Sequence, residues 1–395
     1  MSAAPDVFSP GRIGPLTVRN RVIKSATYEN RARRGLVTDA LIDFHREYAA
    51  GGVGMTTVAY CAVAPAGRTD HHQIVWRDEA LPGLRRLTAA VHGEGAAVSA
   101  QIGHSGPVGV SRGARGGRAL VPSRRGSPAT WAAKTATPAD LARVVAQHGA
   151  AVRMAIEAGF DAVEIHLGHN YLASAFLSPK LNRRRDAYGG ALENRARFAR
   201  EVMRAVRDAA GDRIAILAKL NLDDGVPGGF GLDESVVVAR MLEADGTLDA
   251  LEMTAGSSLL NPMYLFKGDA PVREFAAAMP APARPVVRRF GHRFLKEYPY
   301  QEAYLLPDAR RVRAAVSLPM ILLGGVTNRA TMDTALAEGF AFVAMGRALL
   351  REPDLITRIR ADPATRSRCD HNNRCMPTIF ARSHCVLAPD HGVPG

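Results

Sequence analysis

The segment PADLARVVAQHGAAVRMAIEAGFDAVEIHLG, residues 138–168, contains one complete helix–strand unit. Up to Ala158 its apolar residues recur at three- and four-residue spacing, as they do on one face of a helix. The run DAVEIHLG (161–168) is short and mostly apolar, which is typical of a strand that is buried on both faces of a parallel sheet. The segment therefore predicts a protein in which helices and parallel strands alternate.

The same alternation recurs along the chain. Buried parallel strands are predicted at 21–27, 54–61, 96–103, 161–168, 213–220, 248–256, 318–325 and 340–346. Helices are predicted over Asp39–Ala50, Leu81–Glu94, Pro138–Ala158, Leu192–Ala210, Glu234–Ala244, Pro307–Val316, Asn328–Glu338 and Leu349–Arg360. Eight such units predict an α/β protein whose single domain, residues 1–365, is a (β/α)8 TIM barrel with long βα loop excursions. Residues 366–395 are expected to form a C-terminal tail that is structural or contacts another subunit.

Composition and charge exclude several classes of protein. With 47% apolar and 23% charged residues the chain can bury a large core, and its four cysteines are too few for a disulfide framework. No apolar run approaches the roughly 20 residues that span a bilayer, and no signal peptide is recognisable, so we expect a cytoplasmic protein without a membrane partner. The net charge is +13, but the basic segments 111–118 and 123–127 contain no aromatic residues for base stacking. We therefore expect no nucleic-acid partner, only some attraction for anions such as phosphate esters.

Polar residues and glycines gather where the predicted strands end, which is where barrel enzymes carry their active sites. After the last two strands, Gly324, Gly325 and Gly346 would leave backbone N–H groups free for an anion at helix N-termini. Arg347 adds a guanidinium suited to phosphate oxygens. These residues predict a phosphate site.

The fourth strand end carries His166, His169 and Tyr171. A zinc site would need a further ligand, and no carboxylate or thiolate follows at a metal-like spacing, so no metal is expected. Two ring N–H groups could instead hold one substrate oxygen, while the tyrosine hydroxyl donates a proton. This pattern predicts a site that polarises a carbonyl group.

At this point the sequence resembles a known family. The segments LTVRNRVIKSA, SAQIGHSG, GFDAVEIHLGHNYLASAFLSPKLNRRRDAYGGALENRARF, LLGGV and AMGRALL resemble the old yellow enzyme family of FMN-dependent NADH:flavin oxidoreductases, from Phe8 to about Leu387. The chain looks like the single-domain form, without an iron–sulfur domain or a second nucleotide-binding domain.

The resemblance implies FMN across the barrel mouth and NAD(P)H as the reductant of an ene-reductase. Ala26 and Thr27 would present backbone to the flavin, Gln101 would bond its pyrimidine edge, and Lys219 would stabilise the charge of the reduced ring. The phosphate would bind Gly324, Gly325, Gly346 and Arg347. His166 and His169 would hold the oxygen of an enone-like substrate and make its β-carbon electrophilic. Tyr171 would protonate the neighbouring carbon.

Some features stay open. Tyr28 and Tyr60 stand where the family often has smaller residues. The excursion 258–304 is rich in aromatic residues and either roofs the pocket or packs elsewhere, and a homo-oligomer is neither required nor excluded. The tail offers only Cys369, Cys375 and Cys385, with Asn372 where a fourth cluster ligand would be expected.

Three activities compete on this evidence. The first is NAD(P)H-dependent reduction of an activated C=C bond. The second keeps the flavin but acts as a dehydrogenase, demethylase or isomerase. The third is a flavin-free lyase in which Lys219 forms a Schiff base with the substrate.

Overall fold

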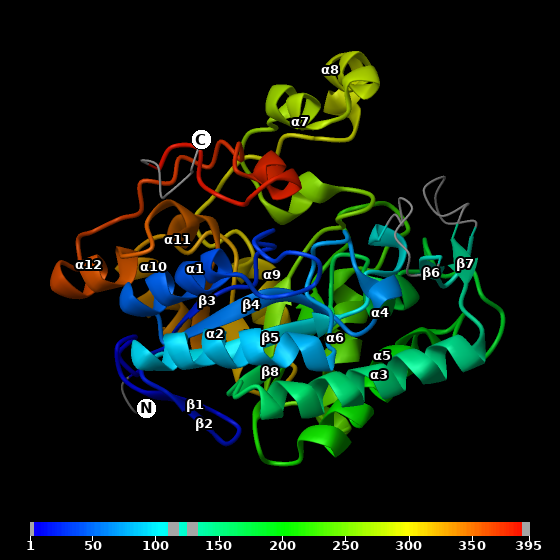
Figure 1. Cartoon of the computed structure of the whole chain (residues 1–395), viewed down its shortest axis with the longest axis horizontal. Coiled ribbons are helices and arrows are strands. Elements are labelled where there is room, and N and C mark those ends of the chain that lie inside the picture. Colours follow the sequence, from blue (N-terminus) through cyan, green and yellow to red (C-terminus); the bar gives the residue numbers. More distant parts are fainter. Residues whose placement is uncertain (1–3, 110–117, 125–132, 389–395) are drawn as a thin grey trace.

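Eight parallel strands close into a barrel in the computed structural model of the chain, which describes residues 4–109, 118–124 and 133–388 (Figure 1). In order around the barrel they are β3 (Val22–Lys24), β4 (Met55–Ala62), β5 (Ala97–Gly103), β8 (Ala162–Leu167), β9 (Ala215–Asn221), β10 (Ala250–Thr254), β11 (Met320–Leu322) and β12 (Phe342–Met345). The last strand pairs with the first. Each lies within a predicted run or extends it by a single residue, so the predicted TIM barrel is confirmed.

Helices surround the barrel (Figure 1). They include α1 (Asp39–Ala50), α2 (Leu81–Gly93), α3 (Pro138–Glu157), α5 (Leu192–Ala210), α6 (Leu232–Ala244), α9 (Leu306–Arg313) and α10 (Arg329–Ala337). The α3 helix begins with a capping box, in which Thr137 and Asp140 bond each other's backbone N–H groups. Its buried residues at 141, 144, 148, 152 and 155 form the stripe that packs on the sheet.

The prediction of a single helix over Leu349–Arg360 was wrong. The structure has two short helices there, α11 (Arg347–Arg351) and α12 (Leu355–Ala361). Pro353 lies between them and has no backbone N–H to continue the ladder of hydrogen bonds. The break lets α11 begin directly after β12, at the carboxyl end of the barrel.

The barrel interior changes from apolar to polar along the strand direction. Near the amino ends, Ala162, Leu217 and Phe342 belong to one buried apolar cluster. A hairpin of β1 (Gly11–Ile13) and β2 (Leu16–Val18) adds two further side chains to that cluster and closes this end. Because side chains alternate between the two faces of a strand, the inward positions two residues farther along β8 and β9 are Glu164 and Lys219. The fold thus places buried charge between the apolar floor and the mouth.

Long segments cover one side of the mouth. Between β10 and α9 the chain forms α7 (Val272–Ala278) and α8 (Arg284–Phe290), which project beside the C-terminal segment (Figure 1). Phe275 contacts Phe380 of the tail with ring centroids 5.6 Å apart, and Arg374 forms a 2.8 Å ion pair with Glu274. The predicted excursion therefore packs on the predicted tail. The division of the chain at residue 365 stays a prediction.

Shorter elements complete the fold: β6 (Leu120–Val121) pairs with β7 (Lys134–Thr135), and α4 (Leu172–Leu177) follows β8. Among the described residues, no helix is both long and apolar enough to cross a membrane. Most of the basic segments predicted at 111–118 and 123–127 lies outside the described residues.

Candidate active site

His166 and His169 lie together at the carboxyl end of β8. Their ring centroids are 5.0 Å apart and their planes stand at 70°. Burial lowers the pKa of His169 to about 3 and holds the pKa of His166 well below its usual value. Both rings are therefore neutral at pH 7, and each carries one N–H group.

Hydrogen bonds indicate which ring nitrogens are free for a ligand. The Nδ1 atom of His166 is enclosed and has no partner among the described residues, so Nε2 is the atom that can meet a substrate. In His169, Nε2 lies 2.8 Å from Oγ1 of Thr254. When the Thr254 hydroxyl donates to Nε2, the ring proton lies on Nδ1, and this N–H is left for a substrate oxygen.

A sharp turn brings the second histidine next to the first. Both His169 and Asn170 have positive φ angles, 57° and 59°, a region that residues other than glycine rarely adopt. The turn is held by the side chain of Asn221 on β9, whose Oδ1 accepts a 3.0 Å bond from the backbone N–H of His169. Asn221 in turn donates to Asp224 and to the carbonyl of Gly256. These contacts fix the His169 backbone at the mouth.

Tyr171 completes the group. Its ring centroid lies 4.3 Å from that of His166 and 5.3 Å from that of Tyr60. Burial raises the pKa of Tyr171, so its hydroxyl stays protonated at neutral pH. In the described part of the chain its hydroxyl has no hydrogen-bond partner, whereas the Tyr60 hydroxyl donates to the carbonyl of Gly67. Tyr171 is thus free to donate to a ligand, and Tyr60 is held by the scaffold.

Beneath the histidines lies a buried cluster of charge. The Lys219 ammonium contacts Oε1 of Glu252 at 2.8 Å and Oε1 of Glu164 at 3.1 Å. Gln101 donates a 2.7 Å bond to the same oxygen of Glu164, and Ser25 donates a 2.8 Å bond to Glu252. Burial alone would lower the pKa of Lys219, but the two carboxylates raise it above its usual value. The lysine is therefore a fixed cation.

The segment after β3 is also at the mouth. Ala26 and Thr27 are partly exposed, and the Thr27 hydroxyl accepts a 2.5 Å bond from Lys24. Tyr28 donates to the Asp70 carboxylate, and burial raises its pKa. This hydrogen bond turns the Tyr28 hydroxyl toward Asp70, which is the structural consequence of having tyrosine at this position.

The predicted phosphate glycines have a packing role that the sequence did not reveal. Gly324 and Gly325 have φ angles of 100° and 79°. A Cβ atom on Gly324 would lie 2.6 Å from Leu305, and one on Gly325 would lie 2.9 Å from the backbone of Gln301. Gly346 is less crowded, since a Cβ there meets only Thr27, at 3.7 Å. The close approach of residues 301–305 therefore explains why glycine is needed at positions 324 and 325, whether or not a phosphate binds there.

Arg347 and the N-terminus of α10 already have partners. Arg347 donates to the carbonyls of Phe266 and Lys267 and to the side chain of Asn373. The Glu302 carboxylate accepts bonds from the backbone N–H of Thr327 at 2.9 Å and from side chains around the first turn of α10. The Glu302 carboxylate, which belongs to the chain itself, thus occupies the helix end at which the sequence predicts a bound anion. Phosphate binding by Gly324, Gly325, Gly346 and Arg347 stays a prediction.

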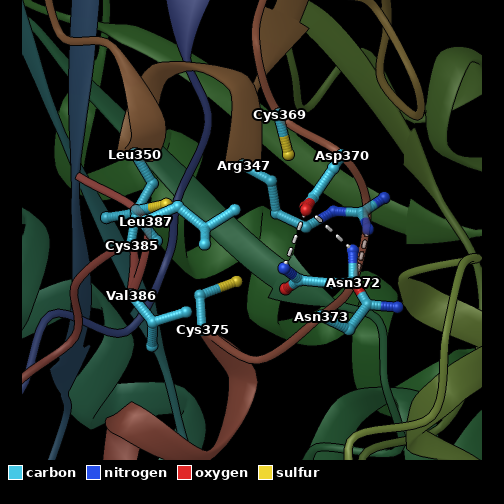
Figure 2. Close-up of a pocket in the computed structure, with 10 residues that line it drawn as sticks. All are labelled: Arg347, Leu350, Cys369, Asp370, Asn372, Asn373, Cys375, Cys385, Val386 and Leu387. Carbon is cyan, nitrogen blue, oxygen red and sulfur yellow. Dashed lines mark hydrogen bonds between the residues drawn. The ribbon is translucent and has the colours of Figure 1, made fainter.

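The tail cysteines line a small pocket beside Arg347 (Figure 2). Cys369, Cys375 and Cys385 point toward this pocket, and Asn372 lines it too. Burial raises the pKa of Cys375 to about 12 and also raises the pKa of Cys369, so both are thiols at neutral pH. Within the described ranges no three His, Cys, Asp or Glu side chains are grouped closely enough to hold a metal ion. The tail docks on the barrel through Ser383, whose N–H donates to the carbonyl of Glu29.

The comparison with known families decides the identity of the barrel. The profile of the NADH:flavin oxidoreductase / NADH oxidase family matches residues 6–255. The chain belongs to this family, the old yellow enzyme family. FMN is its cofactor and NADH or NADPH its reductant, in keeping with relatives named NADH oxidase and NADPH dehydrogenase. The resemblance that the sequence motifs suggested is thereby confirmed.

Relatives differ in size and in named activity. The chain is 50% identical over 384 residues to a 4,4'-dithiodibutanoate disulfide reductase from Rhodococcus erythropolis, covering 97% of this chain and 95% of that protein. It is 33% identical to a metal reductase from Desulforamulus reducens, of which it spans only 51%. A solved complex of 2-naphthoyl-CoA reductase with 2-naphthoyl-CoA aligns at a TM-score of 0.82 and 25% identity, over 97% of this chain and 57% of that one. An old yellow enzyme homologue from Zymomonas mobilis aligns at 0.70 and 23% identity, a likeness of fold.

The residues at the mouth fit a flavin. A flavin pyrimidine ring offers both donors and acceptors, and Gln101 and Lys219 lie side by side through their shared contact with Glu164. Ala26, Thr27 and Gly346 are partly exposed, so a ligand can reach them. A bound FMN would supply hydride chemistry at this place, and the chain supplies the donors around it. These roles of single residues remain proposals.

Two important residues, Glu164 and Glu252, were not predicted from the sequence. Each is a lone acidic residue inside an apolar strand, in DAVEIHLG and LDALEMTAG, and each is almost fully buried. A buried carboxylate needs a partner, and that requirement was the available signal. Thr254, the partner of His169, carried no comparable signal in the sequence.

Buried neutral histidines make stability depend on pH. Burial lowers the pKa of His104 and His169 to about 3 and that of His148 to about 4. Since an unfolded histidine titrates near 6.5, the unfolded state binds more protons below that pH, and stability is lost as the pH falls from about 6.5 toward 4. Each histidine contributes about 1.4 kcal/mol per pH unit in this window. Burial raises the pKa of Glu164 to about 7, so this group binds its proton more tightly in the folded state and gains stability as the pH falls. It offsets the loss from the histidines by at most one proton.

Urea unfolding of the apoprotein at pH 7, 6 and 5 measures this effect. The free energy of unfolding should fall with each step, and His148→Gln should make the fall shallower because one of the titrating groups is gone. A wild-type free energy that stays constant from pH 7 to 5 would contradict the assignment of neutral buried histidines.

Proposed function

We propose that this FMN oxidoreductase takes hydride from NAD(P)H and delivers it to a C=C bond conjugated with a carbonyl group. The observation that carries the proposal is the neutral pair His166 and His169, with ring centroids 5.0 Å apart at the mouth. Beside it lies Tyr171, whose hydroxyl has no hydrogen-bond partner among the residues that the structure describes. Two N–H donors on one carbonyl oxygen withdraw electrons from the conjugated bond and make its β-carbon electrophilic. Hydride then adds to the β-carbon, and Tyr171 supplies the proton to the α-carbon.

The surroundings of Lys219 argue against the lyase alternative. A Schiff-base lysine must lose its proton to attack a carbonyl group, and enzymes lower its pKa for that purpose. Here the carboxylates of Glu164 and Glu252 raise the pKa of Lys219. The residue is better suited to stabilise negative charge on a reduced flavin than to act as a nucleophile. A dehydrogenase, demethylase or isomerase acting on the same flavin would use the same donors.

A second candidate substrate is an aliphatic disulfide with carboxylate ends. The relative from Rhodococcus erythropolis that is named for such a substrate shares 50% identity with this chain over nearly the full length of both. Hydride addition to one sulfur of a disulfide gives one thiol and releases the other sulfur as a thiolate. Tyr171 is positioned to protonate that thiolate, so the same site serves both reactions.

Anaerobic half-reactions separate the candidates. The purified protein should be yellow, release FMN on denaturation, and lose its yellow colour with one equivalent of NADH or NADPH. The reduced protein is then mixed with 2-cyclohexenone, a nitroalkene, a quinone or 4,4'-dithiodibutanoate. We expect reoxidation by the enone with one saturated ketone formed per flavin. Reoxidation by the disulfide alone, with two thiols per flavin, would select the second candidate, and reoxidation by none of them would reject both.

A further inference from the structure

Three side chains inside the barrel form a group that we call the carboxylate–lysine triad: Glu164 on β8, Lys219 on β9 and Glu252 on β10. One ammonium group lies between two carboxylates, at 3.1 Å and 2.8 Å. All three side chains are at most 2% exposed. The triad therefore holds two acids for one base in the barrel interior.

The hydrogen bonds leave part of each carboxylate unsatisfied. Gln101 and Ser25 each donate to an Oε1 atom that already contacts Lys219. The Oε2 atoms of Glu164 and Glu252 are enclosed without a hydrogen-bond partner among the described residues. Fully ionised, the triad would carry an uncompensated negative charge and two unpaired acceptors in the barrel interior, which is costly. One added proton would neutralise the triad and give one of these oxygens a proton to donate.

Other titratable groups face the triad from neighbouring elements. Lys24 on β3 is fully buried, its pKa is lowered by burial to about 8, and it interacts with both Lys219 and Glu252. His166 and His169 lie toward the mouth and are neutral, since burial holds both their pKa values low. Burial raises the pKa of Glu164 to about 7. Lys219 lowers this pKa, whereas the neighbouring Glu252 carboxylate raises it further. The triad is thus balanced between its two protonation states near neutral pH.

We propose that the carboxylate–lysine triad takes up one proton from solvent when the bound FMN accepts hydride. The proposal rests on the flavin lying at the mouth next to Lys219, as the proposed function requires. Hydride transfer adds two electrons and one proton to the flavin and leaves a negative charge on its ring. That charge disfavours a second ionised carboxylate nearby, so one of the two glutamates binds a proton. NADH, oxidised FMN and one solvent proton thus give NAD⁺, anionic reduced FMN and a protonated triad.

The proton count can be read from the midpoint potential of the bound FMN as a function of pH. For a two-electron couple, one coupled proton changes the equilibrium constant tenfold per pH unit, or about 30 mV, and two change it hundredfold, or about 59 mV. The pKa of Glu164 is about 7, so below pH 7 the triad already holds the proton and the slope should be the shallower one. We expect the steeper slope in the wild-type holoenzyme above pH 7, up to the higher pKa that the triad has beside the negatively charged flavin. The absorption spectrum of the reduced flavin shows separately that the ring itself is anionic.

Variants assign the second proton to the triad. Glu252→Gln should reduce the slope to about 30 mV per pH unit, because Lys219 then has only one carboxylate to neutralise. Glu164→Gln should do the same and serves if the first variant does not fold, while Glu252→Asp keeps the acid and should keep the steep slope. Above pH 7, a wild-type slope near 30 mV per pH unit with an anionic flavin, or a slope near 59 mV in both Gln variants, would overturn the proposal. A protein that binds no FMN would instead overturn the proposed function.

Discussion

Replacing Lys219 by methionine is expected to destabilise the apoprotein by about 3–5 kcal/mol at pH 7, the usual effect of removing one partner from a buried ion pair. The change leaves Glu164 and Glu252 next to each other without the ammonium group that contacts both, at 1% and 0% exposure. Protonation of the carboxyl groups relieves the repulsion, so the loss should shrink as the pH is lowered toward 5. FMN retention should weaken as well, since the ring loses its neighbouring cation. Urea unfolding and FMN titration measure the two effects.

A double variant provides the control for this prediction. Lys219→Met combined with Glu252→Gln removes one charge of each sign and should recover a large part of the lost stability, because replacing both partners of a buried pair costs far less than replacing one. Lys219→Met with unchanged stability would show that the ammonium does not balance the two carboxylates.

Replacing Tyr171 by phenylalanine should slow the oxidative half-reaction with enones by about 10²- to 10⁴-fold, the usual contribution of a general acid. The ring that packs on His166 is kept, so affinity for ligands and reduction of the flavin by nicotinamide should change little. Single-turnover reoxidation of the reduced protein by 2-cyclohexenone, followed by stopped-flow absorbance, measures the rate.

Tyr60→Phe is the matched control, because Tyr60 contacts the same ring but its hydroxyl is bonded to the carbonyl of Gly67. Its effect on the rate should be small. Equal slowing in the two variants would mean that the Tyr171 hydroxyl is not the proton donor.

The fold could be predicted closely because each strand is buried on both faces and each helix on one. These two burial patterns have different periods, and the eight barrel strands follow one of them. The other is followed by the helices that surround the barrel: α1, α2, α3, α5, α6, α9 and α10. Shorter elements were missed for a physical reason. The β1–β2 hairpin has strands of only three residues, and α7 and α8, of seven residues each, have few buried positions from which a period could be read.

The site could be predicted only in part. The position of His166, His169 and Tyr171 follows from the rule that active sites lie at the carboxyl ends of barrel strands. The triad depends on cross-strand neighbours, such as Glu252 opposite Lys219, which no local pattern reveals. Likewise, Arg347 appears free in the sequence, yet it bonds a loop about 80 residues away along the chain.

Binding of a phenol tests most directly whether His166 and His169 clamp a substrate oxygen. A phenolate oxygen can accept both ring N–H groups while its ring stacks on the flavin, and the family resemblance implies a long-wavelength charge-transfer band on binding. Titration of the oxidised holoenzyme with 4-hydroxybenzaldehyde should give that band. His166→Ala and His169→Ala should each weaken binding by about ten- to a hundredfold, the worth of one hydrogen bond to a charged group. Wild-type affinity in both variants would contradict the clamp and leave the histidine pair a structural role.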